Sequence, residues 1–266
     1  MKIVFIGGGN MAEAILSAIL TKGLSRPQAI SVSDISEVRR QHLGQKYGVA
    51  VMSSNRQTVG RGDVVVLAIK PQNFVEVMTE LNGQLKPAQL VLSIIAGARI
   101  KTLCLGLNHN CVVRGMPNTP AQIGEGISVW TATAEVTEPQ KEWVSSILSA
   151  MGKEIYVGDE KYIDMATAVS GSGPAYIFLF IESLVDAAVH IGLPHGMAQE
   201  LVLETMLGSG YFAQRSGNSL AELCRMVTSP GGTTAEALLH LEKGGFSELV
   251  KQAVTAAYDK AKDLGG

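Results

Sequence analysis

The stretch that decides the fold is IVFIGGGNMA, residues 3–12 of the chain. Four apolar residues of the kind found in buried strands lead into a G-x-G-x-x-A pattern, and a helical pattern follows directly. Gly7 permits a tight turn, Gly9 lets the backbone approach a pyrophosphate, and Ala12 allows a helix to pack closely on a sheet. The free N–H groups at the helix start would face the phosphates. The stretch therefore predicts a dinucleotide-binding turn; a turn that only connects strand and helix is the alternative.

Outward from this stretch, short apolar runs alternate with amphipathic ones. Because such alternation is typical of a parallel sheet covered by helices, we predict an α/β fold with an N-terminal, doubly wound sheet of Rossmann type. We expect Asn10 and Glu13 to form a capping box at the start of the first helix. The predicted strands are 2–6, 30–33, 49–52, 63–69, 90–95, 111–114, 127–130 and 154–157, and the predicted helices are 11–21, 36–47, 74–81 and 139–151.

The pattern changes near residue 159, beyond which only helical periods remain. We therefore predict two domains, a dinucleotide-binding Rossmann domain of residues 1–158 and an all-helical domain of residues 159–266. The segment 176–189 is apolar around most of its circumference, and such a helix must be buried. A small helical domain has little interior, so we predict an oligomer contact, with the central helix of a monomeric bundle as the alternative. The predicted helices are 165–169, 174–191, 197–214, 220–226, 234–242 and 246–264.

The composition limits the classes of partner. The chain is 46% hydrophobic with a net charge of −2, so it can fill a core and carries no basic field for nucleic acid or an anionic membrane. Glycines and polar residues interrupt the apolar start, so we expect no signal peptide, and we expect no stretch long enough to span a membrane. Cys104, Cys111 and Cys224 share no metal-site spacing, which favours a reducing cytoplasm. No histidine or carboxylate cluster suggests a metal site.

Candidates for cofactor contact lie at the carboxyl ends of the predicted strands, where open parallel sheets bind ligands. Asp34 follows the second strand and would either hold the ribose 2′-hydroxyl of NAD or cap the next helix. Ser33, Ser36, Arg39 and Arg40 would instead accept the 2′-phosphate of NADP. The cofactor-binding candidates are Ile6, Gly7, Gly8, Gly9, Asn10, Met11, Ser33, Asn55, Ala68, Ile69, Lys70, Pro71 and Asn118.

Two further glycine clusters, 170–174 and 229–234, each precede a predicted helix. Glycine N–H groups and hydroxyls at a helix N-terminus are suited to capture a carboxylate or phosphate. Two such clusters favour a small anionic substrate, although helix capping alone would also explain either one. The segment 174–192 carries no lysine, so the β-hydroxyacid dehydrogenases, which use a lysine on such a helix, fit poorly.

Taken in order, the segments 6–11, 68–71, 116–120, 170–176 and 229–234 resemble the motifs of the pyrroline-5-carboxylate reductases. The resemblance covers essentially the whole chain. It implies reduction of L-1-pyrroline-5-carboxylate to L-proline by hydride transfer from NAD(P)H, the final step of proline biosynthesis. It also implies a helical dimerisation domain, a homodimer and possibly a ring of dimers, with NADP(H) favoured over NAD(H). The acidic Asp34, where several relatives carry neutral residues, departs from the pattern and puts this preference in doubt.

The resemblance also assigns roles within the site. Thr234 is the catalytic candidate, because its position matches the family's threonine, and it would orient a protonated imine. Glu160 and Asn118 would help to place the nicotinamide. Rival readings are a dehydrogenase of a hydroxy acid or of a six-membered cyclic imine, and a redox-sensing binding protein without turnover. The substrate-binding candidates are Ser172, Ser229, Gly231, Gly232, Thr233 and Thr234.

Overall fold

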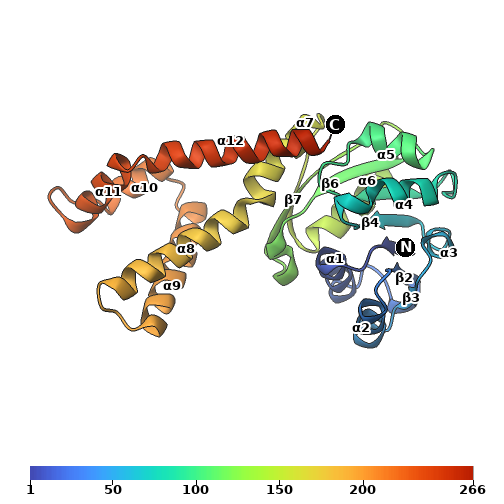
Figure 1. Ribbon diagram of the computed structural model, residues 1–266, viewed down its shortest axis with the longest axis horizontal. Coiled ribbons are helices and arrows are strands. Elements are labelled where there is room, and N and C mark those ends of the chain that lie inside the picture. The colour runs from blue at the N-terminus through green and yellow to red at the C-terminus, as the bar shows by residue number, and fades with distance from the viewer. Residues whose placement is uncertain (266) are drawn as a thin grey trace. The chain divides into compact units, whose positions relative to one another are not determined.

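The computed structural model describes residues 1–265, which form two compact units (Figure 1). The first unit contains residues 1–172 together with the C-terminal segment from residue 257, and the second contains residues 173–256. The first unit extends past residue 158 because the helix that follows packs on the sheet. A functional boundary between residues 158 and 159 stays a prediction.

Within residues 1–265, the first unit is built on an eight-stranded sheet of order β3-β2-β1-β4-β5-β6-β7-β8. All neighbouring strands in this sheet run parallel except β6 and β7, which are antiparallel. Each predicted strand is confirmed, with ends that differ by at most two residues. The strands are β1 (Ile3–Ile6), β2 (Ile30–Ser33), β3 (Ala50–Met52), β4 (Val64–Leu67), β5 (Leu90–Ser93), β6 (Val112–Met116), β7 (Gly126–Ala132) and β8 (Gly152–Tyr156).

Helices cover both faces of the sheet, which is why its central strands are continuous apolar runs. Alternate residues of β1 enter two separate cores. Phe5 belongs to the core that includes buried residues of α1, α2 and α6, and Ile6 to the core that includes buried residues of α3, α4 and α5. The short helices α3 and α5 were not predicted, because few turns carry too little periodicity to be recognised. These helices are α1 (Asn10–Thr21), α2 (Glu37–Tyr47), α3 (Asn55–Val59), α4 (Phe74–Leu81), α5 (Ile100–Leu107) and α6 (Glu138–Ser149).

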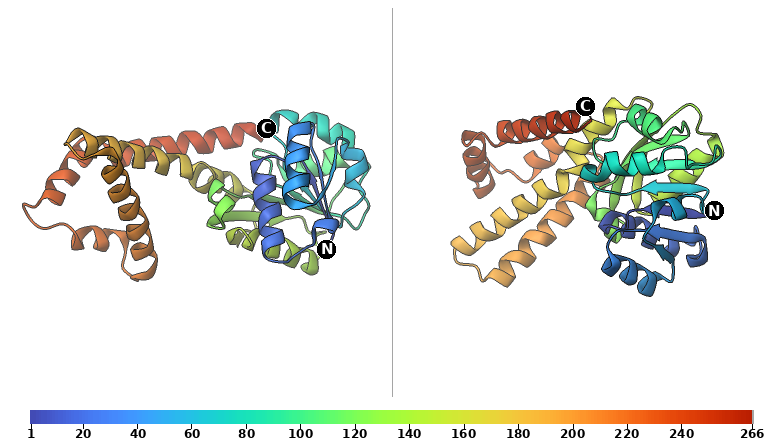
Figure 2. Two further views of the ribbon diagram at one scale, coloured as in Figure 1. Left: turned by 90° about the horizontal axis from the view of Figure 1, so that it is seen from below. Right: turned by 45° about the vertical axis from the view of Figure 1, so that its right-hand side comes forward.

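The second unit is helical, as the sequence predicts, and α8 and α9 pack against each other in it (Figure 2). The last part of α12 belongs to the first unit, where its residue Leu264 contacts the turn at Gly97. A Cβ atom on Gly97, whose φ is 77°, would lie 2.6 Å from the Cβ of Leu264. The helices are α8 (Gly173–His190), α9 (His195–Arg215), α10 (Leu220–Met226), α11 (Thr233–Lys243) and α12 (Phe246–Leu264).

The second glycine cluster is not a free helix N-terminus, which corrects the prediction. It lies inside one helical run from Lys161 to His190, in which α7 (Lys161–Ala166) and α8 are joined by the π-helical turn Thr167–Gly171. Pro174 has no N–H group, and its ring would collide with the carbonyl of the residue four positions earlier. The chain accommodates this with a wider turn, in which the N–H of Ser172 donates to the carbonyl of Thr167 at 2.8 Å.

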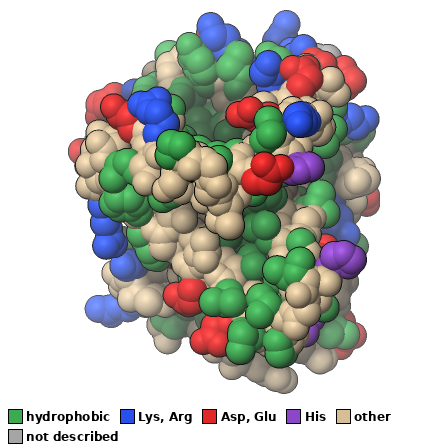
Figure 3. All heavy atoms as spheres, turned by 90° about the vertical axis from the view of Figure 1, so that its left-hand side faces the viewer, with side chains coloured by type: hydrophobic (Ala, Val, Ile, Leu, Met, Phe, Trp, Pro, Cys, Tyr) green, Lys and Arg blue, Asp and Glu red, His purple; other side chains and the backbone are tan. Residues whose placement is uncertain are grey.

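The run from Lys161 to His190 is long and apolar enough, by length and composition, to cross a membrane. The expectation that no stretch reaches this length is therefore wrong by length and composition, because the helix continues from α7 through the π turn into the apolar α8. Within a single chain the α8 part is largely uncovered: Phe178 and Leu179 are 62% and 65% exposed. Figure 3 shows many hydrophobic side chains uncovered on the face it views. Exposed apolar surface of this kind is typical of an interaction surface, and the oligomer contact stays a prediction.

Candidate functional site

The glycine-rich turn lies where β1, β2 and β4 end side by side. Gly7 has a φ of 94°, and its N–H donates to the carbonyl of Ser33 at 2.8 Å. A Cβ atom on Gly7 would lie 2.6 Å from the carbonyl oxygen of Ala68 and 3.1 Å from the side chain of Ile69. Glycine at this position is therefore required both by the backbone conformation and by space. The structure brings Ile6, Gly7, Ala68 and Ile69 together, as the sequence predicts.

Asp34 closes the turn against the end of β2. Its Oδ2 accepts the N–H of Gly8 at 2.8 Å, and its Oδ1 accepts the N–H of Ser36 at 2.8 Å. The cap of α2 is Ser36, whose hydroxyl accepts the N–H of Arg39 at 3.3 Å, so the alternative that Asp34 caps this helix is wrong. At the end of β2 Asp34 has the position of the acidic residue that binds the adenosine ribose in many Rossmann domains, and its contact with a cofactor stays a prediction.

The first turn of α1 leaves N–H groups for phosphate oxygens. Its N-cap is Gly9, with φ −66° and ψ −177°, and no side chain of residues 1–265 caps it. The predicted capping box of Asn10 and Glu13 is therefore wrong. The first N–H groups of a helix have no partner within it, so those at Asn10 and Met11 are available to a pyrophosphate. This is the arrangement that the G-x-G-x-x-A pattern predicts.

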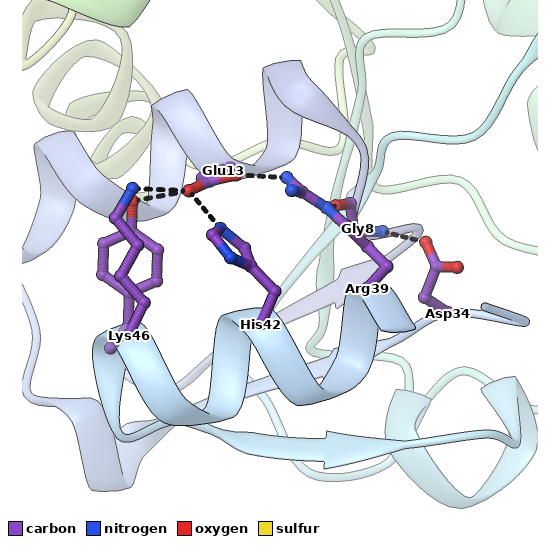
Figure 4. Close-up of polar contacts among 7 residues, drawn as sticks. Gly8, Glu13, Asp34, Arg39, His42 and Lys46 are labelled. Atoms are coloured by element: carbon purple, nitrogen blue, oxygen red, sulfur yellow. Dashed lines mark hydrogen bonds and ion pairs between the residues drawn. The ribbon is translucent and has the colours of Figure 1, made fainter. Parts of the chain in front are cut away.

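Glu13 faces α2 instead and accepts from four side chains (Figure 4). His42, Lys46 and Tyr47 contact its Oε1 at 3.0, 2.9 and 2.9 Å, and Arg39 donates to its Oε2. Burial alone would raise the pKa of Glu13, but the hydrogen bonds outweigh it and lower the pKa from 4.5 to about 2. Glu13 is therefore ionised at neutral pH and ties α1 to α2.

The other cofactor candidates are divided between buried and exposed positions. Ser33 is fully buried, and its hydroxyl donates to Asn55 Oδ1 at 2.7 Å. Asn55, the first residue of α3, donates in turn to Glu80 at 2.7 Å. Lys70 and Pro71 begin the 3₁₀ turn Pro71–Asn73 after β4, with Lys70 exposed. Contacts of these residues with a cofactor stay predictions.

The loop after β6 is held rigidly. The carboxamide Oδ1 of Asn118, a buried residue, accepts the N–H of Ile127 on β7 at 2.9 Å. A Cβ atom on Gly171 of the π turn would lie 3.0 Å from the Cε of Met116, so the π turn packs against the end of β6. The contact role predicted for Asn118 stays a prediction, while its observed bond shows how the loop keeps its shape.

Sequence reasoning missed Arg114, a buried cation on β6. Its Nη1 donates to Glu160 Oε1 at 2.8 Å and its Nη2 to Asp164 Oδ1 at 2.6 Å. Glu160 also accepts the N–H of Ile100, the first residue of α5, at 2.8 Å. A charged residue inside an otherwise apolar strand was the available signal. In this structure Glu160 ties β6, α5 and α7 together.

The third glycine cluster does form a helix start, as predicted. Gly231 has a φ of 69°, and Gly232 is the N-cap of α11, with its N–H donating to the carbonyl of Ser229 at 3.0 Å. Thr233 and Thr234 are the first two residues of the helix. Their N–H groups and hydroxyls therefore stand at the positive end of the helix dipole.

The fold and these features together define a class: a two-part oxidoreductase with a Rossmann unit for a dinucleotide and a helical unit. Residues 160–264 match the family model described as pyrroline-5-carboxylate reductase dimerisation, and residues 2–97 match the one described as NADP oxidoreductase, coenzyme F420-dependent. The pyrroline-5-carboxylate reductase of Pseudomonas aeruginosa is 41% identical over 99% of this chain and 96% of that protein. The Arabidopsis thaliana reductase is 38% identical over 99% and 95%. The chain belongs to the pyrroline-5-carboxylate reductase family.

Solved structures agree in fold over the full length. The pyrroline-5-carboxylate reductase of Coxiella burnetii superimposes with a TM-score of 0.89 at 39% identity, covering 100% of this chain and 98% of that one. The Plasmodium falciparum pyrroline carboxylate reductase, solved with NADP bound, gives a TM-score of 0.92 at 34% identity with the same coverage. The predicted fold class and family are confirmed.

Proposed function

We propose that this chain reduces L-1-pyrroline-5-carboxylate to L-proline with NAD(P)H, as the final step of proline biosynthesis. The observation that carries the proposal is the start of α11. There Gly231 has a positive φ, Gly232 is the N-cap, and Thr233 and Thr234 are the first two helical residues. The relatives of this chain match it over nearly its full length. An anionic, ring-shaped substrate matches amides and hydroxyls at a helix N-terminus.

Each group at this helix start has a separate task. The N–H groups of Gly231 and Thr233, with the hydroxyl of Ser229, would hold the substrate carboxylate, and Ser172 would border the ring. The N–H of Gly232 instead donates to the carbonyl of Ser229 and shapes the turn. NAD(P)H supplies the hydride that adds to the imine carbon, while the ring nitrogen carries a proton, so that C=N becomes CH–NH. The hydroxyl of Thr234 would accept from this protonated nitrogen and orient it, because a neutral hydroxyl is a poor acid. Fixed dipoles of this kind need little reorganisation.

For the cofactor, we further expect a preference for NADPH over NADH. Arg39 and Arg40 in the first turn of α2, together with the NADP bound to the Plasmodium falciparum relative, support it. Asp34 counts against it, and Arg40 already donates to the carbonyls of Asp34 and Ile35 at 2.7 and 3.0 Å. Only a small margin for NADPH is therefore expected.

The helical unit would pair with that of a second copy, forming a homodimer and possibly a ring of dimers. Exposed apolar side chains on α8 and a match to a dimerisation family model support the pairing. A cytoplasmic location is proposed from the three unpaired cysteines, Cys104, Cys111 and Cys224, which suit a reducing compartment.

The deciding experiment follows the loss of NADPH absorbance when pyrroline-5-carboxylate is added, and identifies proline as the product. Parallel assays use a six-membered cyclic imino acid and a hydroxy acid with the oxidised cofactor. If either compound is turned over faster than pyrroline-5-carboxylate, that compound is the substrate and the proposal is wrong. Cofactor binding without oxidation in all assays would favour the redox-sensing binding protein.

A further inference from the structure

We propose that the ion pair between Glu13 and Arg39 sets how strongly the site discriminates NADPH from NADH, with Glu13 limiting the preference for NADPH. This inference deepens the proposed function and rests on it for the identity of the cofactor. It concerns a specificity-determining residue that lies outside the glycine-rich turn itself, one turn into α1.

The pair lies beside the glycine-rich turn, where Gly8 contacts both Arg39 and Asp34, the residue expected near the adenosine ribose (Figure 4). Arg39 Nε donates to the carbonyl of Gly8, while the N–H of the same Gly8 donates to Asp34 Oδ2 at 2.8 Å. Arg39 therefore binds the carbonyl of Gly8, and Asp34 binds the N–H of the same residue. The second contact of Arg39, from Nη2 to Glu13 Oε2, fixes the guanidinium, whose side chain is only 23% exposed.

The charges explain why Glu13 matters for one cofactor more than for the other. NADPH and NADH share the pyrophosphate, so their difference at this end of the site is the 2′-phosphate alone. That phosphate needs a guanidinium in a fixed position. Arg39 is the partly buried candidate, but its charge is already compensated by Glu13, whose side chain is 16% exposed and therefore poorly screened. A 2′-phosphate must compete with the Glu13 carboxylate for Arg39 and is repelled by it.

NADH carries a 2′-hydroxyl at the same place and meets no such competition. Its hydroxyl is suited to the carboxylate of Asp34, which remains at the end of β2. The Glu13–Arg39 pair therefore reduces the difference in affinity between NADPH and NADH, while both cofactors can still bind. Removing the charge of Glu13 would release Arg39 for the phosphate.

The test measures dissociation constants of NADPH and NADH by nicotinamide fluorescence, without imine substrate, on the full-length protein. For Glu13→Gln, we expect the ratio of the NADH constant to the NADPH constant to rise about fivefold, the size expected of one partly screened charge next to a phosphate. Arg39→Met should lower the ratio below that of the wild type. In the Arg39→Met background, Glu13→Gln should leave the ratio unchanged, because the two residues act through one contact.

Tyr47→Phe is the matched control, since it removes a donor to Glu13 but keeps the charge and does not contact Arg39. Its ratio should match that of the wild type, and thermal unfolding should show that each variant is folded. An unchanged or lowered ratio in folded Glu13→Gln overturns the proposal, as does a raised ratio that persists in the double variant. Because the readout is binding, a protein that binds both cofactors but does not reduce the imine would refute the proposed function and leave this inference standing.

Discussion

Arg114 on β6 and Asp164 on α7 form a buried ion pair, with Nη2 2.6 Å from Oδ1. The Arg114 side chain is 1% exposed, and its second nitrogen Nη1 pairs with Glu160 at 2.8 Å. Nε has no hydrogen-bond partner in the part of the chain that the structure describes. The guanidinium is therefore enclosed by protein, and its two carboxylates fasten α7, and with it the π turn, to the strand that leads into Met116.

Replacing Arg114 by Met should destabilise the protein strongly. The buried carboxylate of Asp164 and the partly exposed one of Glu160 would lose their cation. Breaking a buried pair in this way costs about 3–5 kcal/mol in the free energy of unfolding. Asp164→Asn, which keeps an acceptor, should cost about 1–3 kcal/mol. Urea denaturation at one fixed protein concentration measures both. The surface pair Lys251–Glu248 supplies the control, since Lys251→Met should change stability by no more than about 0.5 kcal/mol. If all three variants lose the same free energy of unfolding, Arg114 and Asp164 do not form a stabilising buried ion pair.

Pro174→Ala tests whether the π turn serves the reaction. Alanine would supply the missing N–H and remove the ring that collides with the preceding turn, so the run can return to ordinary α-helical bonding. We expect unchanged or higher thermal stability together with a loss of turnover of about tenfold or more, because Ser172 would rotate on the helix. Dissociation constants for NADPH measured by fluorescence should stay within twofold. Full activity in this variant would show that the π turn only relieves the proline.

The sequence was most informative where a residue pattern is compatible with only one kind of local structure. The strand ends were predicted within two residues because buried parallel strands are uninterrupted apolar runs, as in VVVL at β4. Gly7 was assigned its role correctly because only glycine suits a turn that touches Ala68. Where one pattern has two meanings, sequence reasoning failed. Proline after glycines signals a helix start, and α8 does begin at Gly173, but the pattern did not reveal that the helical run continues back through a π turn into α7.

Contacts between distant residues were beyond the reach of pattern reasoning. Arg114 meets Asp164 across 50 residues of sequence, and nothing in either neighbourhood announces the other. Glu13 matched a capping-box spacing with Asn10, but three turns of α2 offered it four donors instead. Local propensity contributes about 1 kcal/mol at a cap, so a cluster of charged partners outweighs it.

The stability contributed by Glu13 should depend on pH. Its pKa in the folded chain, about 2, lies below the ordinary 4.5, so its contribution is fully present above about pH 4.5 and is lost as the pH falls toward 2. Urea unfolding of the wild type and of Glu13→Gln at several pH values measures this. The difference in unfolding free energy between them should be largest above pH 5 and should shrink toward pH 2. A difference that stays constant would show that the Glu13 charge does not contribute.

Self-association through α8 should fail when charge is placed on its apolar face. Leu179→Glu adds a carboxylate at a position that is 65% exposed in the single chain, so the fold of the chain has little reason to change. In a dimer interface the buried charge would raise the dissociation constant at least about tenfold. Light scattering coupled to gel filtration measures the molar mass. Leu220→Glu on α10 is the control, because Leu220 is 74% exposed but lies outside α8, and this variant should remain a dimer. A dimer that is unaffected by Leu179→Glu would place the interface elsewhere.

Thr234→Ala isolates the chemistry from cofactor binding. Thr234 is the second residue of α11 in the second unit, whereas the cofactor candidates at the glycine-rich turn belong to the first. Removing one preorganised partner of the imine nitrogen should lower kcat about 10²-fold or more, while the dissociation constant for NADPH should stay within about twofold. Thr234→Ser keeps the hydroxyl and should retain most of the activity. If alanine and serine variants lose activity equally, the methyl group and its packing matter, and the hydroxyl does not orient the imine.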